Sequence, residues 1–209
     1  MNKQIKVKKF DNNYFYKVIN VFPEEFLPKL YESSVYWLES TRKEISEEVY
    51  PPEASSELLS YPEHVDSDIW ITFYSEIKKH IAKYCSISEQ NLDNIQLHSA
   101  WITRIEDIEF PGNHNKEALI KGLTHHSSFG NMHSHTGNPI GMVFYLKNPD
   151  PKYGTMVKLE NNKIFQNNGE ENSLLIFNPQ LYHSGVYPKI EETQVHPRIT
   201  IVSDCSYKK

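Results

Sequence analysis

Residues 131–136 read Asn131-Met132-His133-Ser134-His135-Thr136, and an apolar run from Pro139 to Leu146 follows them. Two residues at positions i and i+2 of an extended segment point to the same side of the backbone. The imidazoles of His133 and His135 can therefore face one point inside a sheet or barrel. This arrangement is half of a metal site, and it needs a third ligand from elsewhere in the chain.

The candidate for the third ligand is His183, which follows the strand-like run from Ser173 to Phe177. Three neutral nitrogen donors suit Fe, Zn, Cu or Ni better than Mg or Ca. A single histidine near a turn is usually a surface or hydrogen-bonded residue. A pair that opens one strand, combined with a histidine at the end of another strand, is more specific, and it favours a metal site formed by His133, His135 and His183.

Length and composition restrict the class of protein. The 209 residues fit one domain, with a strand and helical support in residues 1–90 and a β-rich core with the metal site in residues 91–209. The net charge of −5 provides no global basic field, so we expect no nucleic-acid partner. The two cysteines indicate reduced thiols, and no run reaches membrane-spanning length. We expect a soluble cytoplasmic protein that does not associate with a membrane.

The order of predicted elements indicates the fold class. Aromatic and β-branched residues predict a strand over residues 14–21, and apolar spacing predicts helices over residues 22–38 and 62–84. Further strands are predicted over residues 95–105, 140–147, 155–159, 163–166, 173–177 and 198–205. Two helices followed by many strands predict a mainly β barrel or sandwich, with the helices buttressing one outer face.

Two polar segments lie outside these elements. Residues 39–62 are charged and contain Pro51-Pro52, which indicates a surface excursion or a mobile flap. Residues 112–130 form a long polar insertion directly before the histidine pair. Long loops in compact domains tend to be functional lids, but the sequence does not tell whether this insertion forms one.

Arg198 lies on the last predicted strand and shares a face with Thr200. A guanidinium on an otherwise apolar strand is costly to bury without a partner, and a planar carboxylate fits it in bidentate fashion. The partner is either the carboxylate of a ligand or an internal Asp or Glu.

Together these residues resemble the 2-oxoglutarate- and Fe(II)-dependent oxygenases. The shared order is a His-x-ligand pair at one strand, a distal histidine about fifty residues later, and Arg-x-Ser/Thr on a later strand. The opening Val18-Ile19-Asn20-Val21-Phe22-Pro23 is similar to prolyl-hydroxylase-like members, and residues 101–203 are most similar to a bacterial and phage branch. The resemblance implies a double-stranded β-helix, a cupin-like jelly roll, with the metal in the mouth of the barrel.

The resemblance also implies roles for individual residues. His133 and His183 would bind iron, and Arg198 would bind the distal carboxylate of 2-oxoglutarate with help from Thr200 and, less directly, Tyr145. His135 stands where most of the superfamily has Asp or Glu. Either His135 is itself the third ligand, or it turns away and Glu117 or solvent completes the shell.

The implied reaction is the hydroxylation of a small-molecule or peptidyl substrate, with O₂ consumed and succinate and CO₂ released. The cofactors would be Fe(II) and 2-oxoglutarate. Two alternatives remain at this point: a three-histidine cupin-type dioxygenase that needs no 2-oxo acid, and a non-enzymatic jelly roll that binds a metal or ligand. No motif selects a substrate or an oligomeric state.

Overall fold

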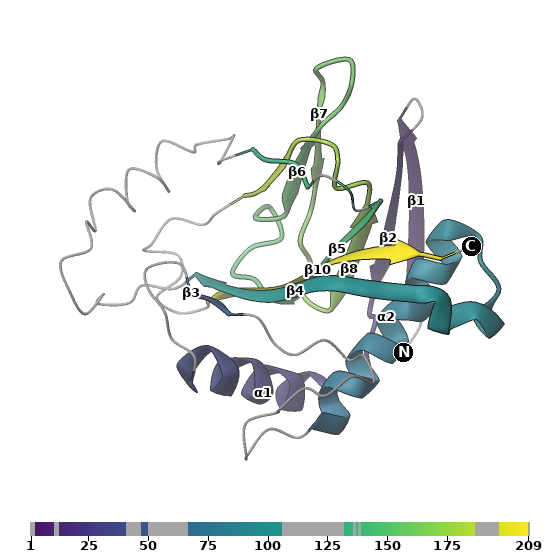
Figure 1. Ribbon diagram of the computed structural model, residues 1–209. Helices are drawn as coiled ribbons and strands as arrows, with labels where there is room; N and C mark the ends of the chain where they lie inside the picture. The colour runs from purple at the N-terminus through teal and green to yellow at the C-terminus, as the bar shows by residue number, and fades with distance from the viewer. Residues whose placement is uncertain are drawn as a thin grey trace.

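The computed structural model describes residues 3–10, 13–40, 47–49, 67–105, 132–135, 137, 139–186 and 197–208 (Figure 1). These residues form two antiparallel sheets and two α-helices, α1 (Leu27–Ser40) and α2 (Ser67–Cys85), with a short 3-10 helix η1 (Glu89–Asn94). The large sheet has the order β1 (Gln4–Phe10), β2 (Asn13–Ile19), β8 (Ser173–Phe177), β5 (Ile140–Lys147), β10 (Arg198–Tyr207), β4 (Ile95–Ile105), β3 (Glu47–Val49). The small sheet has the order β7 (Ile164–Asn167), β6 (Thr155–Lys158), β9 (His183–Gly185).

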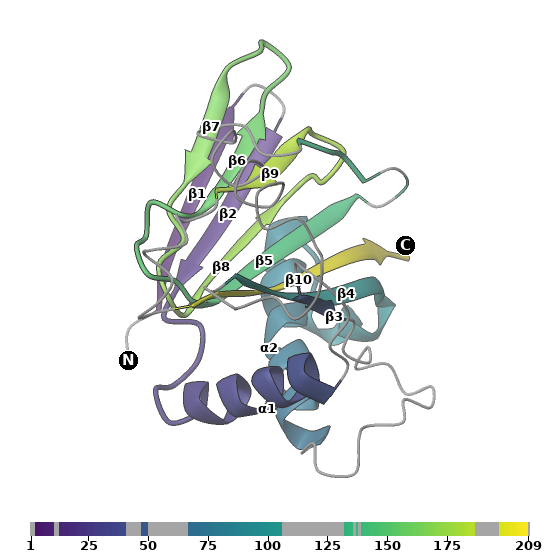
Figure 2. The ribbon, with the colours of Figure 1, turned by 90° about the vertical axis from the view of Figure 1, so that its left-hand side faces the viewer.

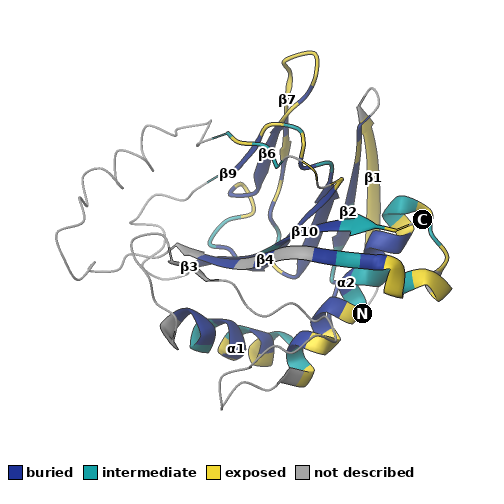
Figure 3. Cartoon of the chain, viewed as in Figure 1, coloured by how far each residue is buried: buried dark blue, intermediate teal, exposed yellow. Residues whose placement is uncertain are grey.

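The large sheet is covered on both faces. On one face, alternate strand residues such as Met142, Ile176 and Ile201 form a core with α1 and α2. On the other face, Tyr145 and Phe177 form a second core with residues of the small sheet. Figure 2 shows the helices beside the large sheet, and Figure 3 shows that its central strands are buried. Because β5 is buried on both faces, its sequence is a continuous apolar run.

The alternation on β10 positions polar side chains between the two sheets. Ile199 and Ile201 belong to the core on the helix side. Arg198, Thr200 and Asp204 therefore share the opposite face of the strand, which looks toward the small sheet. All three are buried, with exposed fractions of 3%, 2% and 4%. The inner face of the last strand thus carries a cation and a carboxylate, whose burial requires polar partners.

The predicted elements agree well with this structure. The strands expected over residues 95–105, 140–147 and 173–177 have these bounds, while β10 continues to Tyr207. The first helix starts at Leu27, because residues 24–26 form a turn. The second helix is described from Ser67 onward, and the predicted residues before it lie outside the described part of the chain. Among the described residues, no helix is both long and apolar enough to cross a membrane.

Three strands of the described part of the chain were not predicted. β1 is an edge strand whose basic residues mask its alternation, and β9 has three residues, too few to show a period. β3 lies within the segment that we interpreted as a surface excursion, and it pairs with β4 at the edge of the sheet. The remainder of that segment, apart from the end of α1, and the whole of residues 112–130 lie outside the described residues.

Among the described residues, the helix-side core contains one imidazole. His80 of α2 is 1% exposed, its Nδ1 lies 3.2 Å from the Tyr16 hydroxyl, and its Nε2 lies 3.4 Å from Glu76 Oε1. Burial lowers the pKa of His80 to about 4, against the opposing influence of the Glu76 carboxylate and with a smaller contribution from the Lys3 and Lys83 ammonium groups. The folded protein therefore holds this ring neutral at pH 7.

This depressed pKa predicts loss of stability in mild acid. The unfolded chain takes up the proton near pH 6.5, but the folded chain takes it up only near pH 4. The stabilisation is thus present above pH 6.5 and is lost as the pH falls toward 4, with a slope of at most about 1.4 kcal/mol per pH unit. We expect His80→Gln, which keeps a partner for Tyr16, to lower this slope in urea unfolding of the metal-free protein at pH 5 and 7.5. An unchanged slope would contradict this assignment.

Candidate metal centre

The segment that holds the histidine pair lies beside β9. His133 N donates to His183 O at 3.0 Å, and His183 N donates to His133 O at 2.8 Å, so the two residues form an antiparallel bridge. His135 N donates to Pro179 O at 2.9 Å. These backbone bonds fix the pair against the chain that leads into β9, and they bring together histidines that are about fifty residues apart in the sequence.

The three rings meet at one point. One ring nitrogen from each of His133, His135 and His183 lies within 4.8 Å of the others. The ring centroids are 5.0 Å apart for His133 and His135, 4.7 Å for His133 and His183, and 4.9 Å for His135 and His183. His183 is buried, His135 half-buried and His133 exposed. Three nitrogen donors therefore surround one position that is open on the His133 side.

His183 is prepared to donate a lone pair. Burial lowers its pKa to about 4, against the hydrogen bond to Leu181 O and the Asp204 carboxylate, and with the neighbouring His133 and His135 lowering it further. The ring is therefore neutral at pH 7. Its Nδ1 lies 2.8 Å from Leu181 O, so the Nδ1–H donates to this carbonyl and the lone pair is on Nε2. A neutral imidazole with a fixed tautomer is the form that binds a transition metal.

A buried carboxylate lies beside the second histidine. Asp204 Oδ2 is 2.7 Å from His135 Nδ1, the separation of a charge-assisted hydrogen bond, although the N–H direction departs from the line that joins the two atoms. Asp204 comes from β10 and His135 from the segment before β5, so the contact ties the histidine pair to the large sheet.

Arg198 lies between the sheets, on the same inner face of β10. Its Nε donates to Tyr153 O at 3.1 Å and its Nη2 to Gly154 O at 3.4 Å. Its Cζ lies 5.9 Å from the centroid of the Tyr145 ring. Two backbone carbonyls and an aromatic face thus fix the plane of the guanidinium, which has five N–H donors in total. This orientation suits bidentate binding of a carboxylate.

The Tyr145 hydroxyl is held in the same region. Its oxygen lies 2.6 Å from Thr155 Oγ1, and Asn167 Nδ2 donates to it at 3.5 Å. Burial raises the pKa of Tyr145, against the lowering influence of Arg198, so the phenol stays protonated at pH 7. Thr155 and Asn167 are two polar residues of the small sheet that the sequence did not single out. Both are buried, and both belong to strands too short to show which residues face inward.

Gly154 explains how Arg198 can reach the backbone. A Cβ atom at this position would lie 1.7 Å from Asn167 O and 2.7 Å from Asn167 C. Only glycine allows the chain before β6 to approach the end of β7 this closely. This approach places the Gly154 carbonyl against Arg198, and the same carbonyl accepts from Val186 N at 2.9 Å.

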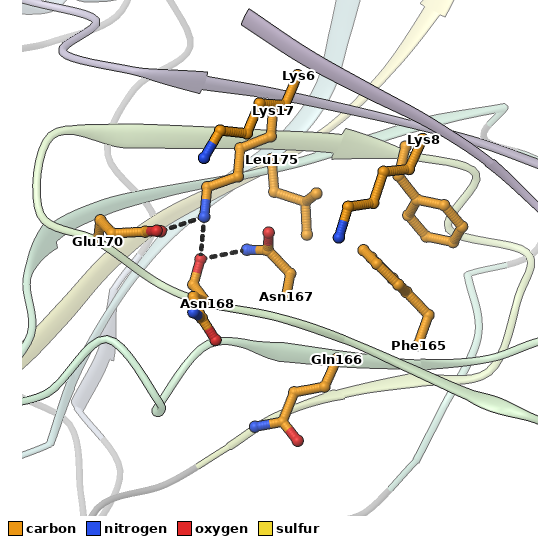
Figure 4. A pocket seen from close by; sticks show the side chains of 10 residues that line it. Lys6, Lys8, Lys17, Phe165, Gln166, Asn167, Asn168, Glu170 and Leu175 are labelled. Atoms are coloured by element: carbon orange, nitrogen blue, oxygen red, sulfur yellow. Dashed lines mark hydrogen bonds and ion pairs between the residues drawn. The ribbon is translucent and has the colours of Figure 1, made fainter. Parts of the chain in front are cut away.

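A hollow of about 150 Å³ lies where the β1–β2 hairpin meets the small sheet (Figure 4). Lys17 pairs there with Glu170 and also donates to Asn168 O, and the Lys8 ammonium lies 5.6 Å from the centroid of the Phe165 ring. Burial lowers the pKa of Lys17, against the hydrogen bond to Glu170. These cations contact groups of the fold itself, so the hollow is a seam between the hairpin and β7 and not part of the three-histidine cluster.

The structure thus brings three of the six candidate site residues into one cluster and places the other three, Arg198, Thr200 and Tyr145, on the inner face of the large sheet. The alternative ligand Glu117 lies outside the described residues. Sequence reasoning missed Asp204. The signal was present, because Asp204 has the same parity as Arg198 and Thr200 on one strand.

No protein-family model matches the sequence, and no curated protein matches it. Solved structures do match it. AviO1 from Streptomyces viridochromogenes is 12% identical, with a TM-score of 0.55, over 92% of this chain and 89% of that chain. A Pseudomonas putida prolyl-4-hydroxylase is 9% identical, with a TM-score of 0.54, over 93% of each chain.

The epimerase SnoN, solved in complex with Fe³⁺, α-ketoglutarate and nogalamycin RO, is 9% identical, with a TM-score of 0.57, over 93% of this chain and 81% of that chain. At these identities the likeness establishes the fold. The chain has the double-stranded β-helix, or jelly roll, of these enzymes, with two helices against one outer face. The prediction of a mainly β jelly roll is confirmed.

Proposed function

We propose that this protein is an Fe(II)- and 2-oxoglutarate-dependent oxygenase that hydroxylates a small-molecule or peptidyl substrate. The observation that carries the proposal is a three-histidine cluster in a jelly roll whose last strand carries a buried arginine on its inner face. Three neutral histidine nitrogens suit Fe(II) and would hold it. The arginine suits the far carboxylate of 2-oxoglutarate.

The residues present fit both cofactors. His183, neutral at pH 7, and the half-buried His135 would hold the metal from inside, and the exposed His133 would hold it from the open side. Arg198 would clamp the distal carboxylate, and the Tyr145 hydroxyl, oriented by Thr155 and Asn167, would donate to it. Thr200 is buried on the same face of β10 as Arg198 and would lie beside that carboxylate.

In the proposed reaction, bound iron supplies the chemistry that couples decarboxylation of 2-oxoglutarate to oxidation of the substrate by O₂. The protein binds and orients. The three histidines leave the side next to His133 open for the substrate, Arg198 fixes the end of 2-oxoglutarate that does not react, and the apolar residues around Tyr145 exclude water from that end.

Two alternative functions use the same fold. A three-histidine dioxygenase without a 2-oxo acid accounts for the histidines but gives Arg198 no ligand to bind. A non-enzymatic jelly roll that binds a metal or ligand accounts for the histidines but predicts no turnover. The structural neighbours include a prolyl-4-hydroxylase and an epimerase from nogalamycin biosynthesis, so the fold itself does not select the substrate class.

Succinate formation tests the proposed activity. Concentrated Fe(II)-loaded protein, supplied with 2-oxoglutarate and O₂ but no substrate, is expected to release succinate slowly, whereas protein loaded with Zn(II) releases none. The measurement is succinate by mass spectrometry over several hours. Formation of the Fe(II)–2-oxoglutarate complex without any succinate above the Zn(II) control would favour the non-enzymatic alternative.

A further inference from the structure

We infer that Asp204 is the positioning residue of His135, and that the two residues together replace the single carboxylate ligand found in sites with two histidines and one carboxylate. This inference rests on the proposed metal site and deepens it. It concerns how the third ligand is oriented and how the charge of the site is balanced. Neither residue alone accounts for both properties.

His135 is fixed at two points, by Pro179 in the turn after β8 and by Asp204 of β10. Its backbone N donates to Pro179 O at 2.9 Å, and its ring Nδ1 lies 2.7 Å from Asp204 Oδ2. Gly141 of β5 pairs with Asp204 of β10, and a Cβ atom on Gly141 would lie 2.8 Å from Pro179 Cβ. The absence of a side chain at Gly141 therefore lets Pro179, and with it His135, approach the strand that carries Asp204.

The position of Asp204 is set by the register of β10. The pairing of β10 with β4 shifts between Asp204 and Cys205, so Asp204 is the last residue before an irregularity. Its alternation with Arg198 and Thr200 directs the carboxylate inward, where it is 4% exposed. A carboxylate this deep is costly unless it accepts a strong hydrogen bond, and the imidazole of His135 is in place to donate one.

The contact determines which nitrogen of His135 binds the metal. When Nδ1–H donates to Asp204, the lone pair is on Nε2, which is the arrangement of carboxylate–histidine–metal sites. His183 is arranged in the same way by Leu181 O. With the Nδ1–H of His135 turned onto Asp204 Oδ2, 2.7 Å away, both His135 and His183 would present Nε2 to the metal.

Charge balance supports the same role. Three imidazoles leave the full charge of a divalent ion in place, whereas two imidazoles and a carboxylate reduce it by one unit. The negative charge of Asp204, which contacts His135 without being a ligand, offsets this extra unit of positive charge. In the described part of the chain, the ligand atoms within 4.8 Å of one another come from the three histidines only, so Asp204 acts through His135 and does not bind the metal itself.

A double-mutant cycle tests this inference through metal affinity alone. The proteins are wild type, Asp204→Asn, His135→Ala and the double variant, with Asp150→Asn as a control on an exposed carboxylate that pairs with Lys152. The dissociation constants of Fe(II) and Zn(II) are measured anaerobically against a chelator, without 2-oxoglutarate. We expect Asp204→Asn to weaken binding about 10- to 100-fold, and Asp150→Asn to leave it unchanged.

The decisive comparison is within the His135→Ala background. If Asp204 acts through His135, then Asp204→Asn causes no further loss of metal affinity there. Wild-type affinity in Asp204→Asn, or a further tenfold loss in the double variant, would overturn the inference. Because 2-oxoglutarate is absent, these results are separate from the proposed activity, which fails if the wild-type protein binds Fe(II) but not 2-oxoglutarate.

A second measurement needs no variant and therefore does not depend on Asp204→Asn folding. In Zn(II)-loaded wild-type protein with ¹⁵N-labelled histidine, NMR spectra of the ring nitrogens report the tautomer of His135. The inference predicts a protonated Nδ1 and a metal-bound Nε2. A metal-bound Nδ1, or a wild-type protein that binds neither metal, would overturn it.

Discussion

Replacing His183 by alanine is expected to abolish tight binding of Fe(II). This residue supplies the most deeply placed of the three nitrogens, and its tautomer is fixed by Leu181 O. Loss of a residue that merely supports a ligand costs about 10- to 100-fold in metal affinity, so loss of the ligand itself should cost at least about 100-fold. The measurement is the dissociation constant of Fe(II), determined anaerobically by competition with a chelator.

The neighbouring residue provides a matched control. Tyr182 is 56% exposed, and its backbone carbonyl, which accepts from Lys158 N, is unaffected by a change of side chain. Tyr182→Ala should therefore retain the wild-type affinity for Fe(II). The bridge between His133 and His183 uses backbone atoms only, so His183→Ala should keep its fold by circular dichroism. Wild-type affinity in a folded His183→Ala protein would remove His183 from the metal site.

The second large effect is expected for Arg198→Ala, which should weaken binding of 2-oxoglutarate while leaving Fe(II) binding intact. Truncating one partner of a buried charge pair costs about 2–5 kcal/mol, which corresponds to roughly 30- to 4,000-fold in affinity. The affinity is measured by anaerobic titration of the Fe(II)-loaded protein with 2-oxoglutarate.

A lysine at the same position separates charge from geometry. Arg198→Lys keeps a cation but loses the planar group that contacts Tyr153 O, Gly154 O and the Tyr145 ring. Its affinity for 2-oxoglutarate should fall between those of wild type and Arg198→Ala. Lys163→Ala, at an exposed turn, should have no effect. Equal affinity in wild type and Arg198→Ala would assign Arg198 a purely structural role.

The sequence alone predicted the ligand candidates because alternation in strands is a strong constraint. An H-x-H pair must present both rings on one side, and Arg198 and Thr200 must share a face of a strand. The same alternation, continued for four residues beyond Thr200, places Asp204 on this face as well. A role for Asp204 was not predicted, because His135, the residue it contacts, is far away in the sequence. Contacts between distant segments, such as Asp204 with His135 or Tyr16 with His80, have no local signal.

The elements that were missed have a common physical cause. β9 is defined by pairing with β6 and by the bridge to His133, and not by any period in its own three residues. β1 carries Lys6 and Lys8 on the face that lines the hollow beside β7, while Ile5 and Val7 on its other face are exposed, so its residues do not show the usual alternation. Tertiary context determines such strands, so they become visible only when the whole sheet is assembled.

The most direct test of the proposed function is an anaerobic titration of the Fe(II)-loaded wild-type protein with 2-oxoglutarate, followed by visible spectroscopy. Chelation of the iron by the keto and carboxylate oxygens of 2-oxoglutarate should produce a metal-to-ligand charge-transfer band that saturates at one equivalent. A protein that binds Fe(II) but shows no band up to saturating 2-oxoglutarate would contradict the account, and the three-histidine cluster would then belong to a protein that does not use a 2-oxo acid.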